Sequence, residues 1–217
     1  MGLELNNFWN FTKSQKISRS AYIIDLIANK IDNNQYIKRF IRYNTINPLS
    51  KRSKSYNNET IIQPDLNTSL KNNSNEIKNT KGEIVESNKS LYLRAFNENM
   101  TTDKQNYIFI ENNHNTYSRD FATMYFRVHI LTPSSFLEIE DENSDINIAR
   151  NKAIACVIDD MLDQYTVDDK YSDLVGNIQF ELTDYNEERL SNSNETIITT
   201  LAYKVNTLGC RIDNYRW

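Results

Sequence analysis

The chain has 217 residues, of which 39% are hydrophobic and 25% are charged, and its formal net charge of −4 indicates no particular partner. This length suffices for a domain with its own hydrophobic core, and we expect a single domain over residues 1–217. No apolar run approaches the roughly 18 residues of a membrane span, so we expect no membrane contact.

The first predicted elements are helical. Apolar side chains in residues 18–32 recur at helical spacing, and Ser18 or Ser20 can cap the start. The pattern continues through 35–43, so one long helix and two helices broken near 33–34 both fit. The side chains of this apolar pattern are Ile23, Ile24, Ile27, Ile31, Tyr36, Ile37, Phe40 and Ile41.

Residues 44–89 lose this pattern. The stretch "NNETIIQPDLNTSLKNNSNEIKNTKGEIVESNKS" is rich in Asn, Ser and Lys and poor in aromatic residues. This composition predicts a long polar loop or insertion. Long loops in compact domains are often functional, so this one is a candidate contact arm.

Beyond residue 90 the apolar period becomes two, which is typical of β-strands. The clearest case has Met124, Phe126 and Val128 on one face, with Arg127 and His129 on the other. A bent continuation is expected in "FLEIED", and "NEERLSNSNE" predicts a long loop inside a C-terminal antiparallel hairpin. The predicted strands are 91–96, 106–110, 123–131, 177–185 and 196–205.

A second helix is predicted over residues 146–165, with Ser144 or Asp145 as its cap. We expect it to lie across one face of the sheet. The fold class is therefore α+β, with an antiparallel or mixed sheet of about five strands, one helix packed across a face, an N-terminal helix and a C-terminal β-hairpin.

The second helix carries Asp159, Asp160 and Asp163 in the pattern Asp-Asp-x-x-Asp. This pattern resembles the magnesium-binding motif of prenyl-diphosphate and terpene enzymes. On a helical wheel the three carboxylates lie opposite the apolar stripe, on the face expected to meet water. A diphosphate site needs carboxylates directed into an enclosed cavity. We therefore expect a solvated face, with no bound metal and no cofactor.

Other catalytic patterns are weak. A Ser-His-Asp or Cys-His site would have to use His114 or His129, and plain surface histidines are the alternative. Cys156 and Cys210 form no Cys-x-x-Cys pair and are expected to be free thiols, with a disulfide as the alternative. The four glycines are too widely spaced for a phosphate-binding loop. We expect no catalytic residue, although an enzyme with a site that the sequence hides stays open.

Residues 36–54 form a basic and aromatic stretch. Cations for phosphates and aromatic rings for stacking suit a nucleic-acid-binding accessory protein. The alternative places Ile37, Phe40 and Ile41 in the core and the cations in water. The stretch consists of Lys38, Arg39, Arg42, Lys51, Arg52 and Lys54, interleaved with Tyr36, Phe40 and Tyr43.

The order of elements resembles that of tail terminators, the neck proteins that cap the tail tube of tailed bacteriophages. "SAYIIDLIANKIDNNQYIKRFIRY" is similar to their opening helix, and "YFRVHIL" to their central strand. "INIARNKAIACVIDDMLDQY" is similar to the helix on their sheet, and "GNIQFEL" with "IITTLAYKV" to their closing hairpin. Residues 44–89 depart from the family, whose members connect these elements more briefly, so other neck or head-completion proteins stay open.

This resemblance implies a structural virion protein that is assembled in the host bacterial cytoplasm and has no catalytic residue. It implies a homo-oligomeric ring, expected to be a hexamer. One face of the ring would bind the tail tube protein and the other the head connector protein, with genomic DNA passing through the lumen.

The charge distribution is compatible with such a ring. Residues 1–55 contain ten basic and three acidic side chains, whereas residues 136–195 contain four basic and sixteen acidic ones. A basic and an acidic region suit head-to-tail contact between subunits. Two solvated faces without mutual contact are the alternative.

Overall fold

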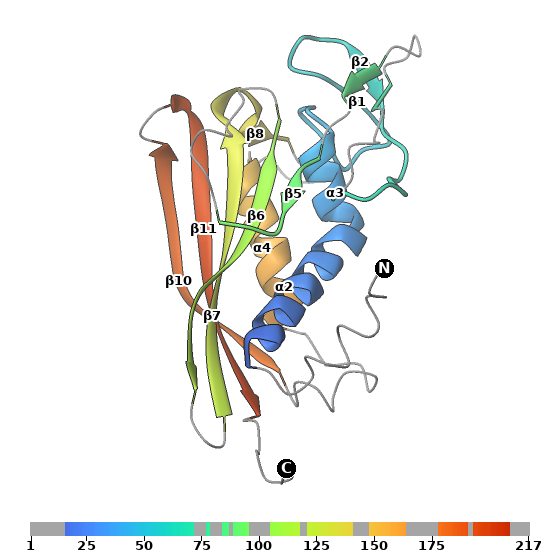
Figure 1. Ribbon diagram of the computed structural model, residues 1–217. Helices are drawn as coiled ribbons and strands as arrows, with labels where there is room; N and C mark the ends of the chain where they lie inside the picture. Colours follow the sequence, from blue (N-terminus) through green and yellow to red (C-terminus); the bar gives the residue numbers. More distant parts are fainter. Residues whose placement is uncertain are drawn as a thin grey trace, which may run out of the picture.

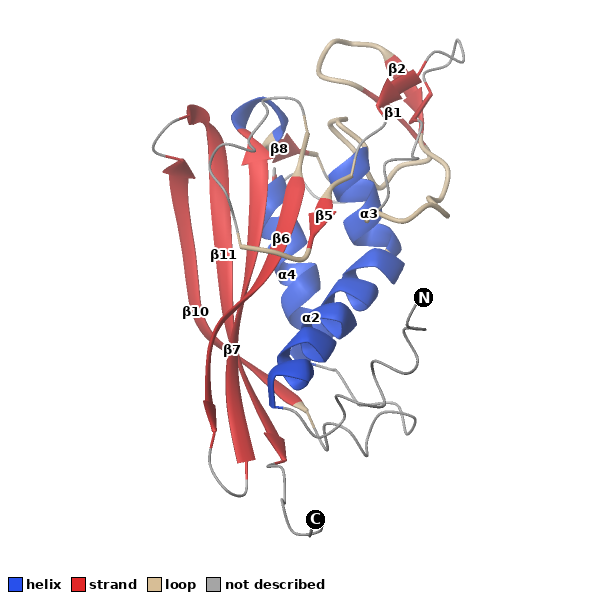
Figure 2. Ribbon diagram, in the orientation of Figure 1, coloured by secondary structure: helices blue, strands red, loops and turns tan. Residues whose placement is uncertain are grey.

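The computed structural model describes residues 16–71, 77–78, 84–86, 89–95, 105–117, 121–140, 148–163, 178–190 and 193–208. Within these ranges, helices lie on one side of a five-stranded sheet, and a small hairpin stands at one end of the molecule (Figure 1, Figure 2). The sheet is mixed, so the fold is the α+β arrangement that the sequence predicts.

The sheet has the strand order β10–β11–β7–β6–β5. Neighbouring strands are antiparallel, except that β5 runs parallel to β6. Strands β7 and β11 pair without interruption from Phe121 opposite Leu208 to Pro133 opposite Thr196. This long ladder joins the β6–β7 hairpin to the β10–β11 hairpin. The strand bounds are β5 Leu91–Tyr92, β6 Tyr107–Tyr117, β7 Phe121–Pro133, β10 Gln179–Leu190 and β11 Ser193–Leu208.

The helices are α2 (Lys16–Asn33), α3 (Gln35–Arg42) and α4 (Arg150–Asp163). Asn34 separates the first two, because its side chain accepts a hydrogen bond from the Ile37 amide at 3.1 Å and caps α3. The predicted N-terminal segment is therefore two helices broken at the Asn pair. Helices α2 and α4 both contact the sheet.

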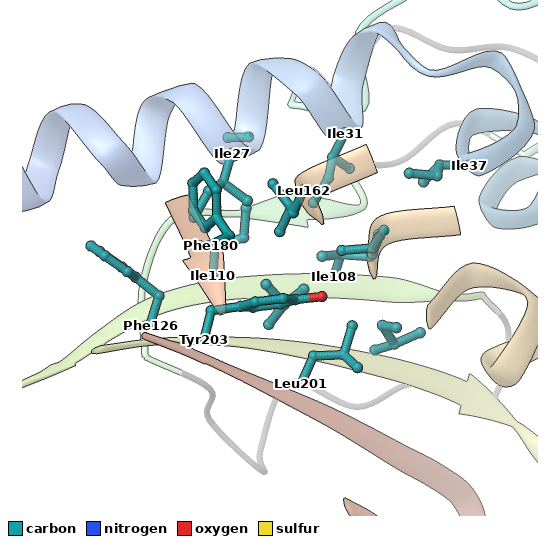
Figure 3. Close-up of a cluster of buried hydrophobic side chains, with 14 of the residues drawn as sticks. Ile27, Ile31, Ile37, Ile108, Ile110, Phe126, Leu162, Phe180, Leu201 and Tyr203 are labelled. Atoms are coloured by element: carbon teal, nitrogen blue, oxygen red, sulfur yellow. The ribbon is translucent and has the colours of Figure 1, made fainter. Parts of the chain in front are cut away.

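The main core lies between these helices and the sheet (Figure 3). The apolar stripes of α2 and α4 meet the inward-facing side chains of β6, β7 and β11. Burying each such isoleucine or leucine stabilises the fold by about 1.5–3 kcal/mol. Side chains of this core that are at most 1% exposed include Ile27, Ile31, Ile37, Ile108, Ile110, Phe126, Ile158, Leu162, Leu201 and Tyr203.

Two strands extend at least five residues beyond their predicted ends. Strand β6 continues past residue 110 to Tyr117, and β10 continues past residue 185 to Leu190. The predicted long loop at 186–195 is therefore wrong for residues 186–190, which belong to β10, and for residues 193–195, which belong to β11. Backbone pairing extends these strands although their exposed side chains do not alternate.

The segment after β7 is not the predicted bent continuation of that strand. A 3₁₀ turn, η2 (Ser134–Phe136), follows β7, and β8 (Glu138–Ile139) pairs with β9 (Ile148–Ala149) in a separate two-stranded sheet. Helix α4 consequently begins at Arg150 and not at residue 146. The caps predicted at residues 144 and 145 lie outside the described residues.

Residues 44–71, called the arm below, belong to the predicted long polar loop or insertion and contain β-structure. Strands β1 (Arg52–Lys54) and β2 (Thr60–Ile62) form a hairpin in the arm. Asn58 at its turn has a φ of 63°, a left-handed conformation that asparagine tolerates well. Later in the predicted loop, β3 (Ile77–Lys78) pairs with β4 (Ile84–Glu86).

Arg150 joins the arm to the helices. Its side chain is fully buried, and its guanidinium donates to the carbonyls of Phe40 at 2.6 Å, Tyr43 at 2.8 Å and Thr45 at 2.6 Å. A further bond reaches the Phe136 carbonyl at 2.7 Å. These acceptors include the end of α3, where a cation also interacts favourably with the helix dipole. One side chain therefore satisfies carbonyls from three separate segments.

Candidate interaction surfaces

A hollow of about 610 Å³ lies between α3 and the arm. Its lining includes three exposed apolar side chains, Tyr36 (60% exposed), Leu49 (44%) and Ile62 (51%). These residues come from three different segments, α3, the start of the arm and β2. An exposed apolar cluster of this kind is a candidate contact surface.

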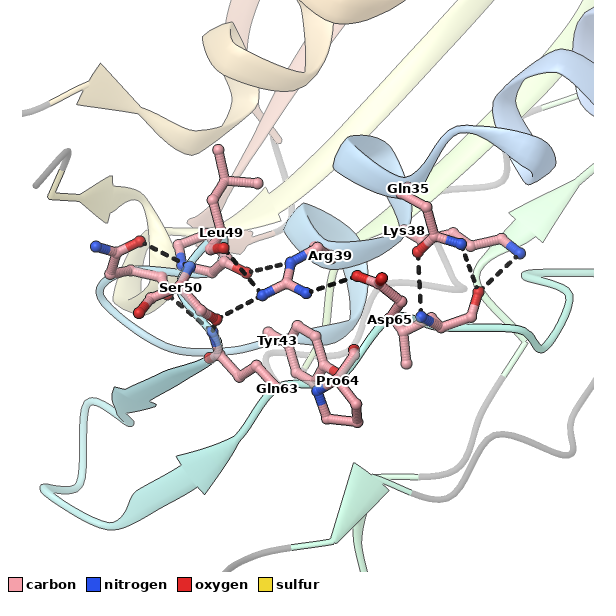
Figure 4. Close-up of polar contacts among 12 residues, drawn as sticks. Gln35, Lys38, Arg39, Tyr43, Leu49, Ser50, Gln63, Pro64 and Asp65 are labelled. Carbon is pink, nitrogen blue, oxygen red and sulfur yellow. Dashed lines mark hydrogen bonds and ion pairs between the residues drawn. The ribbon is translucent and has the colours of Figure 1, made fainter. Parts of the chain in front are cut away.

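Arg39 of α3 lines the hollow. Its polar contacts connect α3 to the arm (Figure 4). Its guanidinium donates to the carbonyls of Pro48 at 3.1 Å and Leu49 at 3.0 Å, and also to that of Ser50. It forms an ion pair with Asp65 at 3.2 Å. Arg39 lies on α3 and thereby holds the first turn of the arm against this helix.

Other polar contacts fix the opposite side of the hollow. The Gln35 amide group makes two hydrogen bonds with the backbone of Leu66, and the Lys38 ammonium donates to the same Leu66 carbonyl (Figure 4). The Tyr43 hydroxyl donates to the Pro64 carbonyl. Burial raises the pKa of Tyr43 to about 12, so this donor stays protonated at neutral pH.

The basic stretch 36–54 is therefore split between the interior and the surface. Ile37, Phe40 and Ile41 lie in the core, as one of the two interpretations predicts. The cations of α3 are not in water, however. Lys38 and Arg39 are each 6% exposed, and Arg42 is 1% exposed. The combined cation and aromatic surface predicted for nucleic acid is absent from α3, because Phe40 and Tyr43 are buried too.

The exposed cations of this stretch are Lys51, Arg52 and Lys54, all on the arm. Lys51 lines the hollow beside Ile62, and Arg52 pairs with Ile62 across the β1–β2 hairpin. The apolar lining of the hollow is thus bordered by positive charge. Asp65 also lines it, but its carboxylate is engaged by Arg39.

A second exposed surface lies at the other side of the sheet, along edge strand β10. Residues 181–188 of this strand are all exposed and contain four acidic and no basic side chains. We call these eight residues the acidic edge. Leu182 (39% exposed) and Tyr185 (45%) pair with the core residues Tyr203 and Leu201, so they point toward the helix side of the sheet.

Tyr185 lies next to α4 and to two charged groups. Its hydroxyl donates to the Glu187 carboxylate at 3.1 Å, and Lys152 of α4 lies 3.9 Å from that carboxylate. Burial, Glu187 and then the nearby Cys156 thiol raise the pKa of Tyr185 to about 12. The α4 side of the acidic edge therefore combines apolar surface with the Glu187 carboxylate.

The Asp-Asp-x-x-Asp motif of α4 divides in the structure. Asp160 and Asp163 are exposed, as predicted, but Asp159 is half-buried and accepts a hydrogen bond from the Tyr203 hydroxyl at 3.0 Å. Burial of the Tyr203 hydroxyl is the main cause that raises its pKa, and the Asp159 carboxylate raises it further. Across the part of the chain that the structure describes, no group of three or more His, Cys, Asp or Glu residues is placed to hold a metal ion.

The prediction of free thiols can be compared with the structure for one of the two cysteines. Cys156 is an exposed free thiol on the side of α4 near β10, in agreement with the predicted free thiol. Cys210 lies outside the described residues, so the free thiol expected there stays a prediction.

His129 lies between Glu111 and Thr200 on the sheet face opposite the helices. Its Nε2 is 3.2 Å from the Glu111 carboxylate, and its Nδ1 is 2.9 Å from the Thr200 hydroxyl. Burial lowers the pKa of His129, while Glu111 opposes that shift. The three residues face one another across strands β6, β7 and β11. Cross-strand pairs of this kind stabilise a sheet, so their proximity does not by itself indicate catalysis.

His114 stacks on Tyr125 with ring centroids 4.1 Å apart. It lies on β6. Both histidines are therefore strand residues, His114 on β6 and His129 on β7.

A protein-family model described as YomW matches residues 34–205. The chain belongs to the YomW family. The YomW name follows the style of genes in a Bacillus phage region, which suggests a phage-associated protein. The YomW match includes both the hollow and the acidic edge. No curated protein sequence matches the chain. Within the described ranges, no helix is long and apolar enough to cross a membrane.

Proposed function

We propose that the chain is a structural protein of a tailed-phage neck, and specifically a tail terminator. It assembles into a ring, with about six subunits as the expected number, in the host bacterial cytoplasm. One face of the ring caps the tail tube protein, and the other joins the head connector protein. Genomic DNA passes through the lumen, and the assembled protein resides in the virion.

The observation that carries this proposal is the arrangement of the elements. Helix α2, hairpin β6–β7, helix α4 and hairpin β10–β11 follow one another in the order that the tail-terminator resemblance implies. Both helices pack into one core on one face of the sheet. The phage-style name of the YomW family supports the same setting.

In this proposal the protein has no catalytic residue and acts through contacts alone. The clusters of polar side chains that would favour an enzyme contain two or three residues each. Glu111, His129 and Thr200 meet on a sheet face, and Asp159 is engaged by Tyr203. Both arrangements have a structural role across neighbouring elements.

Nucleic-acid binding through residues 36–54 is the second candidate function. Only the part of this stretch that lies on the arm still offers exposed cations for it. Lys51, Arg52 and Lys54 still provide exposed positive charge. A nucleic-acid-binding surface loses affinity steeply as salt rises, because bound counterions are released. A salt titration against DNA and RNA with the Lys51→Ala, Arg52→Ala, Lys54→Ala triple variant measures this candidate directly.

Capping of tail tubes tests the neck proposal. Tail tube protein from the same phage is polymerised with and without the purified chain, and tube lengths are measured by negative-stain electron microscopy. We expect shorter tubes with a ring at one end. Tubes of unchanged length and with bare ends would contradict the proposal.

A further inference from the structure

The hollow and the acidic edge have complementary properties. The hollow has an apolar lining of Tyr36, Leu49 and Ile62 beside exposed Lys51. The acidic edge presents exposed Leu182 and Tyr185 on the helix side of the sheet, beside the Glu187 carboxylate. These five apolar residues are five of the seven large hydrophobic side chains that are exposed in the described residues. The exposed apolar surface is thus concentrated on two patches, one beside Lys51 and the other beside Glu187.

The two patches lie on opposite sides of the molecule. Strand β10 is at one edge of the sheet, whereas α3, β1 and β2 are at the far end of the helix layer (Figure 1). A single copy therefore cannot place its own acidic edge into its own hollow. The same pair of patches can meet between two copies. The copy that contributes its hollow then keeps a free acidic edge, and the copy that contributes its edge keeps a free hollow.

We propose that the hollow of one copy receives the acidic edge of a second copy, with Leu182 and Tyr185 entering it and Lys51 facing Glu187. This contact is heterologous, so it repeats from copy to copy and closes into a ring when the rotation permits. The proposal rests on the ring assembly of the proposed function and assigns the surfaces that form it.

The local structure favours this contact in two ways. Arg39, Gln63 and Asp65 hold the wall of the hollow through hydrogen bonds and an ion pair, so the cavity is preformed before binding. The occupant lies on a strand that is paired along its length with β11. Two preordered surfaces lose little conformational entropy on association.

The native Cys156 thiol provides a reporter beside the acidic edge, because it is exposed and lies close to Tyr185. The test variant is Ile62→Cys in a Cys210→Ser background, which places a second thiol in the hollow. Mild oxidation is followed by a denaturing gel without reductant. We expect a ladder of dimers, trimers and larger species linked between position 62 of one copy and Cys156 of the next.

Two matched variants separate the proposed contact from random collision. Leu93→Cys in the same background places a thiol at another exposed leucine (42% exposed) outside both patches, and we expect no ladder above dimer. Adding Cys156→Ser to the Ile62→Cys variant leaves one thiol per copy, so only a dimer linked between two copies of position 62 can form. We expect little of this dimer, because the proposed contact places position 62 against Cys156 and not against a second position 62. A ladder of equal intensity in Leu93→Cys, or a dimer after Cys156→Ser as abundant as that of the parent variant, would overturn the assignment.

Charge exchange gives an independent measurement in the absence of new thiols. Lys51→Glu and Glu187→Lys each weaken self-association at low salt, roughly fivefold, because each places like charges opposite one another. Combining the two substitutions restores association to within about twofold of wild type. Full additivity of the two losses would contradict a direct meeting of these side chains.

Native mass spectrometry of the wild-type chain distinguishes this inference from the proposed function. A ring without an Ile62→Cys ladder overturns the assignment of the surfaces and leaves the ring function intact. A ladder from a chain that forms open chains and no ring supports the contact and overturns ring closure. The absence of both ladder and ring, also when tail tubes are present, overturns both proposals.

Discussion

The main core and the arm are held together by different interactions. The core places isoleucines of α2 and α4 against β6, β7 and β11, and it is almost entirely apolar. The arm is attached through buried cations, Arg39 and Arg150, that donate mainly to backbone carbonyls. An apolar core tolerates substitutions that preserve volume, whereas a cation that satisfies several fixed carbonyls depends on its geometry.

The largest effect is expected from Arg150→Met. Removing the guanidinium leaves at least the Phe40, Tyr43 and Thr45 carbonyls buried without this donor. We expect the free energy of unfolding to fall by about 3–5 kcal/mol, measured by urea denaturation. Arg150→Lys keeps the charge but not the fork of donors, and we expect it to lose at least about 2 kcal/mol.

Lys152→Met is the matched control for Arg150→Met, because Lys152 is an exposed cation on the same helix. Its effect should stay within about 0.5 kcal/mol. Equal stability of the Arg150→Met variant and wild type would show that the carbonyls find other partners.

The core should respond to volume. Ile158 of α4 is fully buried, so Ile158→Ala is expected to lower the free energy of unfolding by about 3 kcal/mol, and Ile158→Val by about 1 kcal/mol. The steep dependence on size contrasts with Arg150, where the conservative lysine is already costly. Ile62→Ala, at a half-exposed position, serves as the control in the same denaturation experiment. An Ile158→Val loss as large as that of Ile158→Ala would contradict the volume dependence.

Asn34 caps α3, the helix that leads from the core into the arm. Asn34→Ala removes the acceptor for the Ile37 amide and should cost about 1 kcal/mol, whereas Asn34→Asp should retain most of it. The neighbouring exposed Asn33→Ala variant is the control. Thermal unfolding that leaves Asn34→Ala and Asn33→Ala indistinguishable would argue against the cap.

The smallest effect concerns pH and His129, on the sheet face away from both regions. Its pKa is lowered by burial, with Glu111 and Glu188 raising it and Arg127 lowering it, so the folded protein favours the neutral ring. The unfolded chain then binds more protons below the usual histidine pKa of about 6.5. Stability is complete above that pKa and is lost as pH falls through the folded pKa.

We therefore expect wild type to lose more stability than His129→Asn between pH 7.5 and 5.5, in parallel urea titrations. The His129→Asn substitution also changes the surroundings of Glu111. The Glu111→Gln variant is therefore measured in the same titrations, to show how much of the pH dependence of stability comes from Glu111. A larger pH-dependent loss in His129→Asn than in wild type would reverse the predicted sign.

Most of the core was predictable from the sequence, because its residues repeat at the period of their own element. Ile27 and Ile31 follow helical spacing, and Phe126 and Val128 alternate along β7. The exposed ends of β6 and β10 lack such a period. Their strand structure comes from backbone pairing with β7 and β11, which single-strand patterns do not reveal.

The arm and the hollow were not predictable for a different reason. Lys38, Arg39 and Arg42 are expected in water, because buried cations are rare unless their donors are satisfied. The carbonyls that satisfy Arg39 belong to residues 48–50, ten positions further along the chain. Tyr36, Leu49 and Ile62 likewise meet only in the folded structure. No local pattern connects these segments.

Native mass spectrometry of the purified wild-type chain, over a range of concentrations and with negative-stain images of the same sample, tests ring assembly most directly. We predict a closed ring of about six subunits with a central hole. A chain that stays monomeric at every concentration, and also when tail tubes are present, would contradict this account.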